Sequence, residues 1–168
     1  ESIFKRFSSE IKLIIHAAAQ PSHDWAYKNP ILDFDINARA TLHLLQCFKK
    51  YSSKSTFIFT STNKVYGDLI NNFKLNEMKT RFEINKKNLF FKKGVSEKFS
   101  IDKSVHSFFG SSKTSADLYV QEFGKNFNLN TGIFRCGCIT GENHAGTEAH
   151  GFLNYLTKKI MTKKSYKI

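Results

Sequence analysis

The sequence predicts an α/β fold, a partial Rossmann-like parallel sheet flanked by helices. A short apolar run at 12–16, a helical apolar pattern over 35–49 and a second β-rich run at 56–61 follow one another along the chain. Strand, helix and strand in this order are typical of a parallel βαβ unit. The chain has 168 residues, of which 40% are hydrophobic and 14% aromatic. That is enough apolar material for the core of one domain.

The first half of the chain gives the clearest elements. The strand at 12–16 ends in three alanines and a Gln-Pro-Ser loop. The helix over 35–49 carries apolar residues at offsets of four, three and three, which places them on one face. These residues are Ala38, Leu42, Leu45 and Phe48. Polar residues at 51–54 end this helix, and the Thr, Phe and Ile content of 56–61 favours a second strand.

The second half begins with a long polar segment. From Asp68 to about Ser104 the chain is rich in Asn and Lys without a sustained period, so we expect a surface loop with one short helix. Helical spacing returns from about Phe109 and predicts a second crossover helix. A third strand at 131–136, a loop at 137–146 and a helix near 152–161 follow. The residues that give the helical spacing of the crossover helix are four, three and four positions apart: Ala116, Val120, Phe123 and Phe127.

The charge and the cysteines exclude several classes of protein. A net charge of +12 attracts polyanions, but the lysines occur as scattered pairs without an RNA-recognition signature, so we expect no specific nucleic acid. Three cysteines without a C-x-x-C pair exclude a disulfide scaffold and a four-cysteine zinc site, and suggest a reducing, cytoplasmic setting. The six histidines include no H-E-x-x-H, so we predict no metal site. Apolar runs are too short to cross a membrane, and the start lacks a signal-peptide core.

The loops after the three strands are the candidate ligand sites, because ligands of open parallel sheets bind outside the carboxyl ends of the strands. The alanines at 17–19 leave room either for a flat ligand or for tight helix packing. Residues 60–64 gather three hydroxyls, an amide and an ammonium, which favours a sugar or phosphate over a solvated turn. Taken alone, Lys113 is expected to be a solvated surface charge. Cys136 and Cys138 are expected to serve in packing.

Three motifs in this order resemble the extended short-chain dehydrogenase/reductases, the NAD-dependent nucleotide-sugar epimerases and dehydratases. His16-Ala17-Ala18-Ala19-Gln20 is similar to the strand-end motif over the cofactor, and residues 37–42 are similar to the N-V-x-G-T-x-x-L helix. Thr60-Ser61-Thr62-Asn63-Lys64-Val65-Tyr66-Gly67-Asp68 is similar to the S-S-x-x-V-Y-G segment. The resemblance covers nearly the whole chain. Within the family, residues 61–68 are most similar to epimerases of CDP-linked sugars.

The resemblance implies NAD as cofactor and a nucleotide sugar, CDP-linked, as substrate. Thr62 falls on the catalytic Ser/Thr that hydrogen-bonds the reacting sugar hydroxyl. Lys113 falls on the lysine of Tyr-x-x-x-Lys, which holds the nicotinamide ribose and lowers the pKa of the tyrosine. Phe109 stands at the tyrosine position and has no proton to exchange, so the usual general base is missing. Three residues are candidates to replace it, and the spacing favours none: His106, Tyr66 and Tyr119.

The resemblance also implies the rest of the site. It makes 1–137 the central part of an NAD-binding Rossmann domain and 138–168 the start of a nucleotide-sugar-binding region. The implied cofactor contacts are Ala18, Ala19, Gln20, Tyr66, Lys113, Cys136 and Cys138. The implied substrate contacts are Thr62, Asn63, Asn143 and His144.

Two features depart from the family pattern besides Phe109. The nine glycines include no two that are two or three positions apart, so the glycine-rich turn that binds the pyrophosphate is not present. We therefore expect the middle part of a longer epimerase, in which the strand at 12–16 lacks its usual neighbour. An open strand edge predicts poor solubility, self-association or completion by another chain.

The expected activity is that of an NAD-dependent nucleotide-sugar epimerase, which inverts C2 of a CDP-linked dideoxyhexose through a transient keto sugar and return of the hydride. The alternative is a catalytically inactive truncated remnant or binding module of the same fold. A 4,6-dehydratase is disfavoured, because Asn63 and Lys64 stand where that chemistry usually has an acid/base pair.

Overall fold

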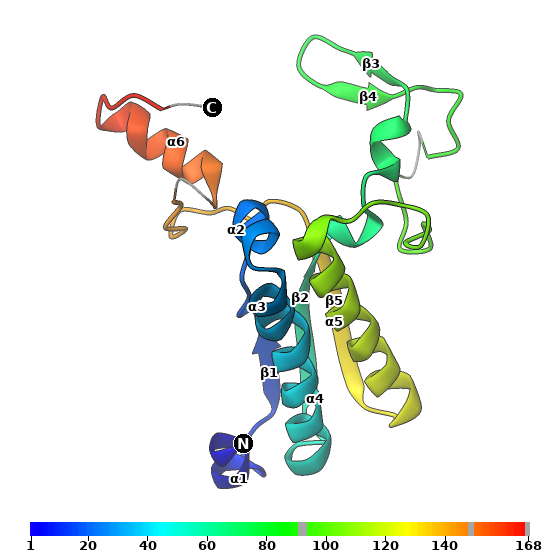
Figure 1. Cartoon of the computed structure of the whole chain (residues 1–168), viewed down its shortest axis with the longest axis vertical. Coiled ribbons are helices and arrows are strands. Elements are labelled where there is room, and N and C mark those ends of the chain that lie inside the picture. The colour runs from blue at the N-terminus through cyan, green and yellow to red at the C-terminus, as the bar shows by residue number, and fades with distance from the viewer. Residues whose placement is uncertain (91–93, 148–149, 167–168) are drawn as a thin grey trace.

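A computed structural model of the chain describes residues 1–90, 94–147 and 150–166. Its centre is a three-stranded parallel sheet in the order β1–β2–β5, with helices across one face (Figure 1). The strands are β1 (Leu13–His16), β2 (Thr56–Thr62) and β5 (Asn130–Cys136). β2 pairs in parallel with both neighbours, which confirms the predicted α/β class and the partial Rossmann-like sheet.

The helical segment before β2 begins earlier than the expected 35–49. Helix α3 (Pro30–Phe34), a π-helical turn (Asp35–Arg39) and α4 (Ala40–Tyr51) follow one another without a break. Pro30 at the first helical position favours this start, because proline lacks the N–H that would be unpaired there. The apolar period missed α3 because its buried residue, Asp33, is polar.

The core lies between the sheet and the helices. Helix α5 (Ser107–Asn126) packs beside α4, and a short α1 (Ser2–Phe7), which the sequence did not predict, adds one aromatic ring. Of the apolar residues in the two predicted helical patterns, Phe127 lies after the end of α5 and is 44% exposed. Four others, two on α4 and two on α5, are buried in the core cluster as predicted. Its buried members are Phe4, Leu45, Phe48, Phe57, Phe59, Ala116 and Val120.

The segment between β2 and α5 contains more structure than the expected surface loop with one short helix. Two 3₁₀ turns (Asn63–Tyr66 and Leu69–Asn72) lead to an antiparallel hairpin of β3 (Leu75–Glu77) and β4 (Phe82–Ile84). The loop prediction was therefore wrong for the hairpin, because strands of three residues are too short to show a period.

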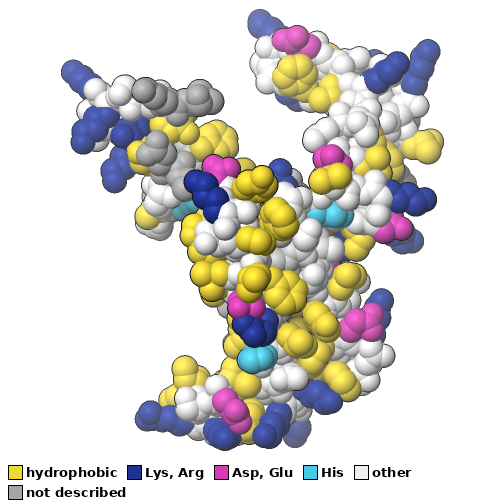
Figure 2. Space-filling model, in the orientation of Figure 1, with side chains coloured by type: hydrophobic (Ala, Val, Ile, Leu, Met, Phe, Trp, Pro, Cys, Tyr) yellow, Lys and Arg dark blue, Asp and Glu magenta, His cyan; other side chains and the backbone are white. Residues whose placement is uncertain are grey.

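Two arms extend beyond the carboxyl end of the sheet. One carries the β3–β4 hairpin and the other carries α6 (Phe152–Met161), the predicted last helix (Figure 1). Figure 2 shows an open hollow between these arms, above the ends of the strands. No helix in the described part of the chain is long and apolar enough to span a bilayer.

Strand β1 forms one edge of the sheet and pairs only with β2 among the described residues. Leu13 and Ile15 are 53% and 61% exposed. The predicted open edge is thus confirmed, while its consequence, association or poor solubility, stays a prediction.

Candidate active site at the carboxyl end of the sheet

Three segments meet at the carboxyl ends of the strands. Helix α2 (His23–Lys28) and the Asn63–Tyr66 turn both pack against the first turns of α5. Ser22 begins α2, because its hydroxyl accepts a hydrogen bond from the Trp25 N–H at 3.3 Å. The alanines at 17–19 are exposed after β1, so the edge of the sheet is not blocked there by side chains.

Thr62 is the last residue of β2 and lies opposite Cys136 of β5. Its Oγ1 accepts a hydrogen bond from the Lys64 N–H at 3.2 Å, which fixes the start of the 3₁₀ turn. The Thr62 side chain is half-buried. Thr62 is thus partly accessible at the carboxyl end of β2.

Lys113 is buried, with 3% of its surface exposed, so the expectation from its position alone, a solvated charge, was wrong. Its Nζ donates to the Thr60 carbonyl at 2.9 Å and lies 4.1 Å from the centre of the Phe59 ring. Burial lowers the pKa of Lys113 to about 8, although the charges of nearby groups favour the ammonium. Thr60 is two residues before Thr62, about 7 Å along the strand, so both groups lie near the same strand end.

Phe109 lies one helical turn before Lys113 on α5 and is 8% exposed. The ring of His23 contacts it edge-on, with the two ring centroids 4.9 Å apart. His23 Nδ1 is 3.0 Å from Ser107 Oγ. No sequence motif identifies His23. The one hint in the sequence was its position just after the loop that follows the first strand.

The three candidate replacements for the tyrosine base are either engaged in other contacts or distant from Phe109. Both ring nitrogens of His106 face backbone carbonyls, those of Lys64 at 3.2 Å and Ile101 at 2.6 Å. The buried Tyr66 hydroxyl accepts a hydrogen bond from Arg135 Nη1 at 3.2 Å. Tyr119 is ten residues after Phe109 on α5, which is about 15 Å along the helix.

A buried polar network holds the loop after β1 against α3 and α5. The Gln20 side chain donates to Asp33 Oδ1 at 2.7 Å, and its backbone N–H donates to Asn37 Oδ1 at 2.9 Å. Asn37 donates to Asp33 Oδ1 at 3.0 Å, and Ser112 donates to Asp33 Oδ2 at 2.6 Å. Sequence reasoning did not identify this network. The signal was two polar residues, Asp33 and Asn37, one helical turn apart on an inward face.

A second buried pair joins α5 to β5. Arg135 donates to both carboxylate oxygens of Asp117, at 3.0 and 2.9 Å. Ser61, on the helix-facing side of β2, and Gln121 donate to the same carboxylate at 2.6 and 2.8 Å. Burial alone would raise the pKa of Asp117, but these hydrogen bonds and the Arg135 charge lower it below its ordinary value.

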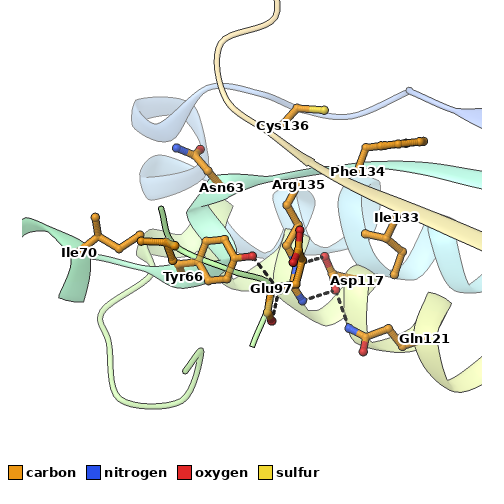
Figure 3. A pocket seen from close by; sticks show the side chains of 11 residues that line it. Asn63, Tyr66, Ile70, Glu97, Asp117, Gln121, Ile133, Phe134, Arg135 and Cys136 are labelled. Atoms are coloured by element: carbon orange, nitrogen blue, oxygen red, sulfur yellow. Dashed lines mark hydrogen bonds and ion pairs between the residues drawn. The ribbon is translucent and has the colours of Figure 1, made fainter. Parts of the chain in front are cut away.

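Figure 3 shows this pair beside a pocket of about 620 Å³. The pocket brings together three of the expected site residues, Asn63, Tyr66 and Cys136. In the figure the Tyr66 hydroxyl points towards Arg135, and the dashed lines join Arg135 and Gln121 to Asp117.

Other expected site residues lie apart from this group. Strand β5 ends at Cys136, so Cys138 is not on the strand and its thiol is exposed. Asn143 and His144 belong to the loop before α6, in the arm away from the hairpin (Figure 1). His144 lines a separate hollow of about 530 Å³ with α6 residues. Its Nδ1 is buried and has no hydrogen-bond partner among the described residues.

Comparison with known proteins adds the family context. A family model described as the NAD dependent epimerase/dehydratase family matches residues 1–168. CDP-paratose 2-epimerase of Salmonella typhi is 36% identical over 151 residues, which are 89% of this chain and 42% of the relative. dTDP-D-glucose 4,6-dehydratase of Dictyostelium discoideum is 30% identical over 142 residues, 84% of this chain and 29% of the relative. The chain thus spans less than half the length of these curated relatives.

Solved structures show the same fold. The UDP-glucose 4-epimerase of Thermus thermophilus, in complex with NAD, superposes with a TM-score of 0.70 at 20% identity over 98% of this chain and 46% of that one. The UDP-glucuronic acid 4-epimerase of Bacillus cereus, in complex with NAD, gives a TM-score of 0.67 at 23% identity over 98% of this chain and 44% of that one. At these identities the likeness concerns the fold.

Proposed function

Because the chain belongs to the NAD dependent epimerase/dehydratase family, we propose that it is part of an NAD-dependent nucleotide-sugar epimerase. The observation that carries this proposal is the 36% identity with CDP-paratose 2-epimerase over 89% of the chain. It favours inversion at C2 of a CDP-linked sugar. Since the match spans 42% of that relative, the activity is proposed for the protein that contains these residues.

The site residues fit the nicotinamide riboside end of NAD. The Lys113 ammonium has three donors, and among the described residues one of them is used, by the Thr60 carbonyl. The other two suit the hydroxyls of a ribose. The small, exposed Ala18 and Ala19 leave space for the cofactor at the end of β1, and Gln20 shapes that loop through its buried bonds. The residues of this chain include no glycine-rich turn for the pyrophosphate end.

The substrate would lie above Thr62, with its reacting hydroxyl bonded to Oγ1. Bound NAD would supply the hydride acceptor and then the hydride donor, so it is recycled. This chain would orient the sugar hydroxyl with Thr62, accommodate the sugar beside Asn63 and Tyr66, and leave the hollow between the two arms for rotation of the keto sugar. Cys136 would line the side of the site that holds the nicotinamide ring.

We assign residues 1–137 to the NAD-binding core and 138–168 to the start of the nucleotide-sugar region. Within the part of the chain that the structure describes, His144 Nδ1 is buried without a hydrogen-bond partner. This supports the second assignment, because such an atom costs about 1–3 kcal/mol unless a ligand satisfies it. Asn143, next to it, and Cys138, at the start of this region, are weaker candidates for ligand contacts.

Phe109 favours a second candidate function, a catalytically inactive remnant or binding module. Product analysis separates the two. The protein that contains this chain is incubated with NAD and a CDP-linked 3,6-dideoxyhexose, and the configuration at C2 is read by NMR. Inversion at C2 supports the epimerase. Cofactor binding without any conversion would support the binding module.

A further inference from the structure

We propose that His23 is the general base of this site and takes the role of the tyrosine that Phe109 replaces. This inference rests on the proposed epimerase function and deepens it. His23 is the first residue of α2, in the loop region after β1, and its side chain is exposed.

The position of the imidazole ring is the first argument. It contacts the Phe109 ring at a centroid distance of 4.9 Å and an interplanar angle of 63°. Phe109 in turn lies one helical turn from Lys113, whose ammonium is at the end of β2. The imidazole is thus beside the residue position from which the family tyrosine would act, at the carboxyl end of the sheet.

The second argument is the hydrogen bonding of the ring. Ser107 Oγ accepts the Gly110 N–H at 3.2 Å and has a second lone pair for the Nδ1–H of His23 at 3.0 Å. Ser107 holds this position with a φ of 61°, a left-handed conformation that costs a non-glycine residue about 1–3 kcal/mol. When Nδ1 carries the proton and donates to Ser107 Oγ, Nε2 carries the lone pair, and this is the tautomer that the proposal requires. Among the described residues Nε2 has no hydrogen-bond partner.

The surroundings of the ring favour the neutral imidazole, with burial as the largest cause. Partial burial and the Lys64 ammonium lower the pKa of His23, and the carboxylates of Asp24 and Asp33 oppose this shift more weakly. Lys64 lies on the turn after β2, Asp24 on α2 and Asp33 on α3. A neutral imidazole with a free Nε2 is the form that can accept a proton.

The other proton-accepting groups near the strand ends lack this freedom. His106 has a carbonyl oxygen at hydrogen-bond distance from each ring nitrogen, so neither nitrogen is open to a substrate. Tyr66 is buried and bonded to Arg135. His23 is therefore the residue that the contacts favour.

The proposed oxidation and its reversal conserve protons and electrons. Nε2 takes the proton of the sugar hydroxyl, and the electrons of the O–H bond form the second bond of the carbonyl. The C–H hydride leaves at the same time to the oxidised nicotinamide of NAD. After the keto sugar has rotated, the hydride returns to the opposite face of the carbon, and the imidazolium gives its proton back to the oxygen.

The test compares His23→Gln with the control His43→Gln, which removes an exposed histidine on α4. General acid-base groups contribute about 10²–10⁴-fold, so epimerisation should fall at least 100-fold in the first variant and less than threefold in the control. NAD affinity should stay within threefold in both. Phe109→Tyr in the His23→Gln background should restore part of the rate. A His23→Gln protein that keeps epimerisation within threefold would overturn the proposal.

A measurement independent of activity separates failure of this inference from failure of the proposed function. The ¹⁵N shifts of the His23 ring in the wild-type chain at pH 7 should show a protonated Nδ1 and an unprotonated Nε2. If no CDP-sugar is converted, the epimerase function is wrong, and this spectrum still decides the state of the ring. A protonated Nε2, or an imidazolium at pH 7, would overturn the assignment of His23 as the base.

Discussion

Replacing Asp117 by Asn is predicted to remove a large part of the stability of the chain. The carboxylate is fully buried and accepts four hydrogen bonds, two of them from the Arg135 guanidinium, which is itself 12% exposed. Asn keeps the volume but turns an N–H towards the donors and leaves the guanidinium without a counter-charge. Breaking a buried ion pair in this way costs about 3–5 kcal/mol, against a total of about 5–15 kcal/mol for a typical domain.

Urea unfolding followed by circular dichroism measures this loss, with Glu122→Gln as the matched control. Glu122 lies on the same helix, is exposed and accepts one side-chain bond, from Asn126, so its change should stay within about 0.5 kcal/mol. A cost below about 1 kcal/mol for Asp117→Asn would refute the reasoning that the pair holds β2, α5 and β5 together.

The Asp117 carboxylate should also make the stability of the folded chain depend on pH in acid. Because the folded pKa of Asp117 is lower than its ordinary value of 3.8, the folded state keeps the charge after the unfolded chain has become protonated. Its contribution is therefore complete above the ordinary pKa and is lost as the pH falls through the folded pKa. The Asp117→Asn variant should lack this part of the acid denaturation.

Three further predictions concern other parts of the chain. The pKa of Lys113 is lowered to about 8 from 10.5, so the unfolded chain binds more protons than the folded chain between these pH values. The free energy of unfolding should therefore rise from pH 8 to 10.5. A Lys113→Met protein that shows the same rise would exclude this cause. Gly67→Ala should cost about 3 kcal/mol or more, because Gly67 has a φ of 62° and an added Cβ would lie 2.8 Å from the Val105 carbonyl oxygen; unchanged urea unfolding would contradict this. The open edge of β1 should make the chain self-associate, and Ile15→Lys should reduce this association in sedimentation velocity; a wild-type monomer at all concentrations would disprove it.

The sequence predicted those elements whose apolar residues keep a regular period. The inward faces of α4 and α5 followed from spacings of three and four, and the core cluster contains Leu45, Phe48, Ala116 and Val120 as expected. The start of α3 and the β3–β4 hairpin were missed for physical reasons. Asp33 interrupts the apolar face, because a buried hydrogen-bond network replaces hydrophobic contact there.

The sequence predicted the residues of the candidate site that lie near the strand end. It did not predict the residues that contact them. Thr62 and Lys113 followed from motifs, and the structure places both near the end of β2. The contact of His23 with Phe109 joins residues 86 positions apart, and no local pattern encodes such a contact. Lys113 alone was expected in solvent, because burial of its ammonium depends on how α5 packs on β2.

The most direct measurement is a titration of NAD into the protein, followed by calorimetry and by the amide shifts of β2. Saturable binding should perturb Thr60 and Thr62. Lys113→Met should weaken the affinity at least tenfold, because a hydrogen bond to a charged group contributes about 1.5–3 kcal/mol. Equal affinity in the Lys113→Met protein, or no saturation at millimolar NAD, would contradict the placement of the nicotinamide riboside at the carboxyl end of this sheet.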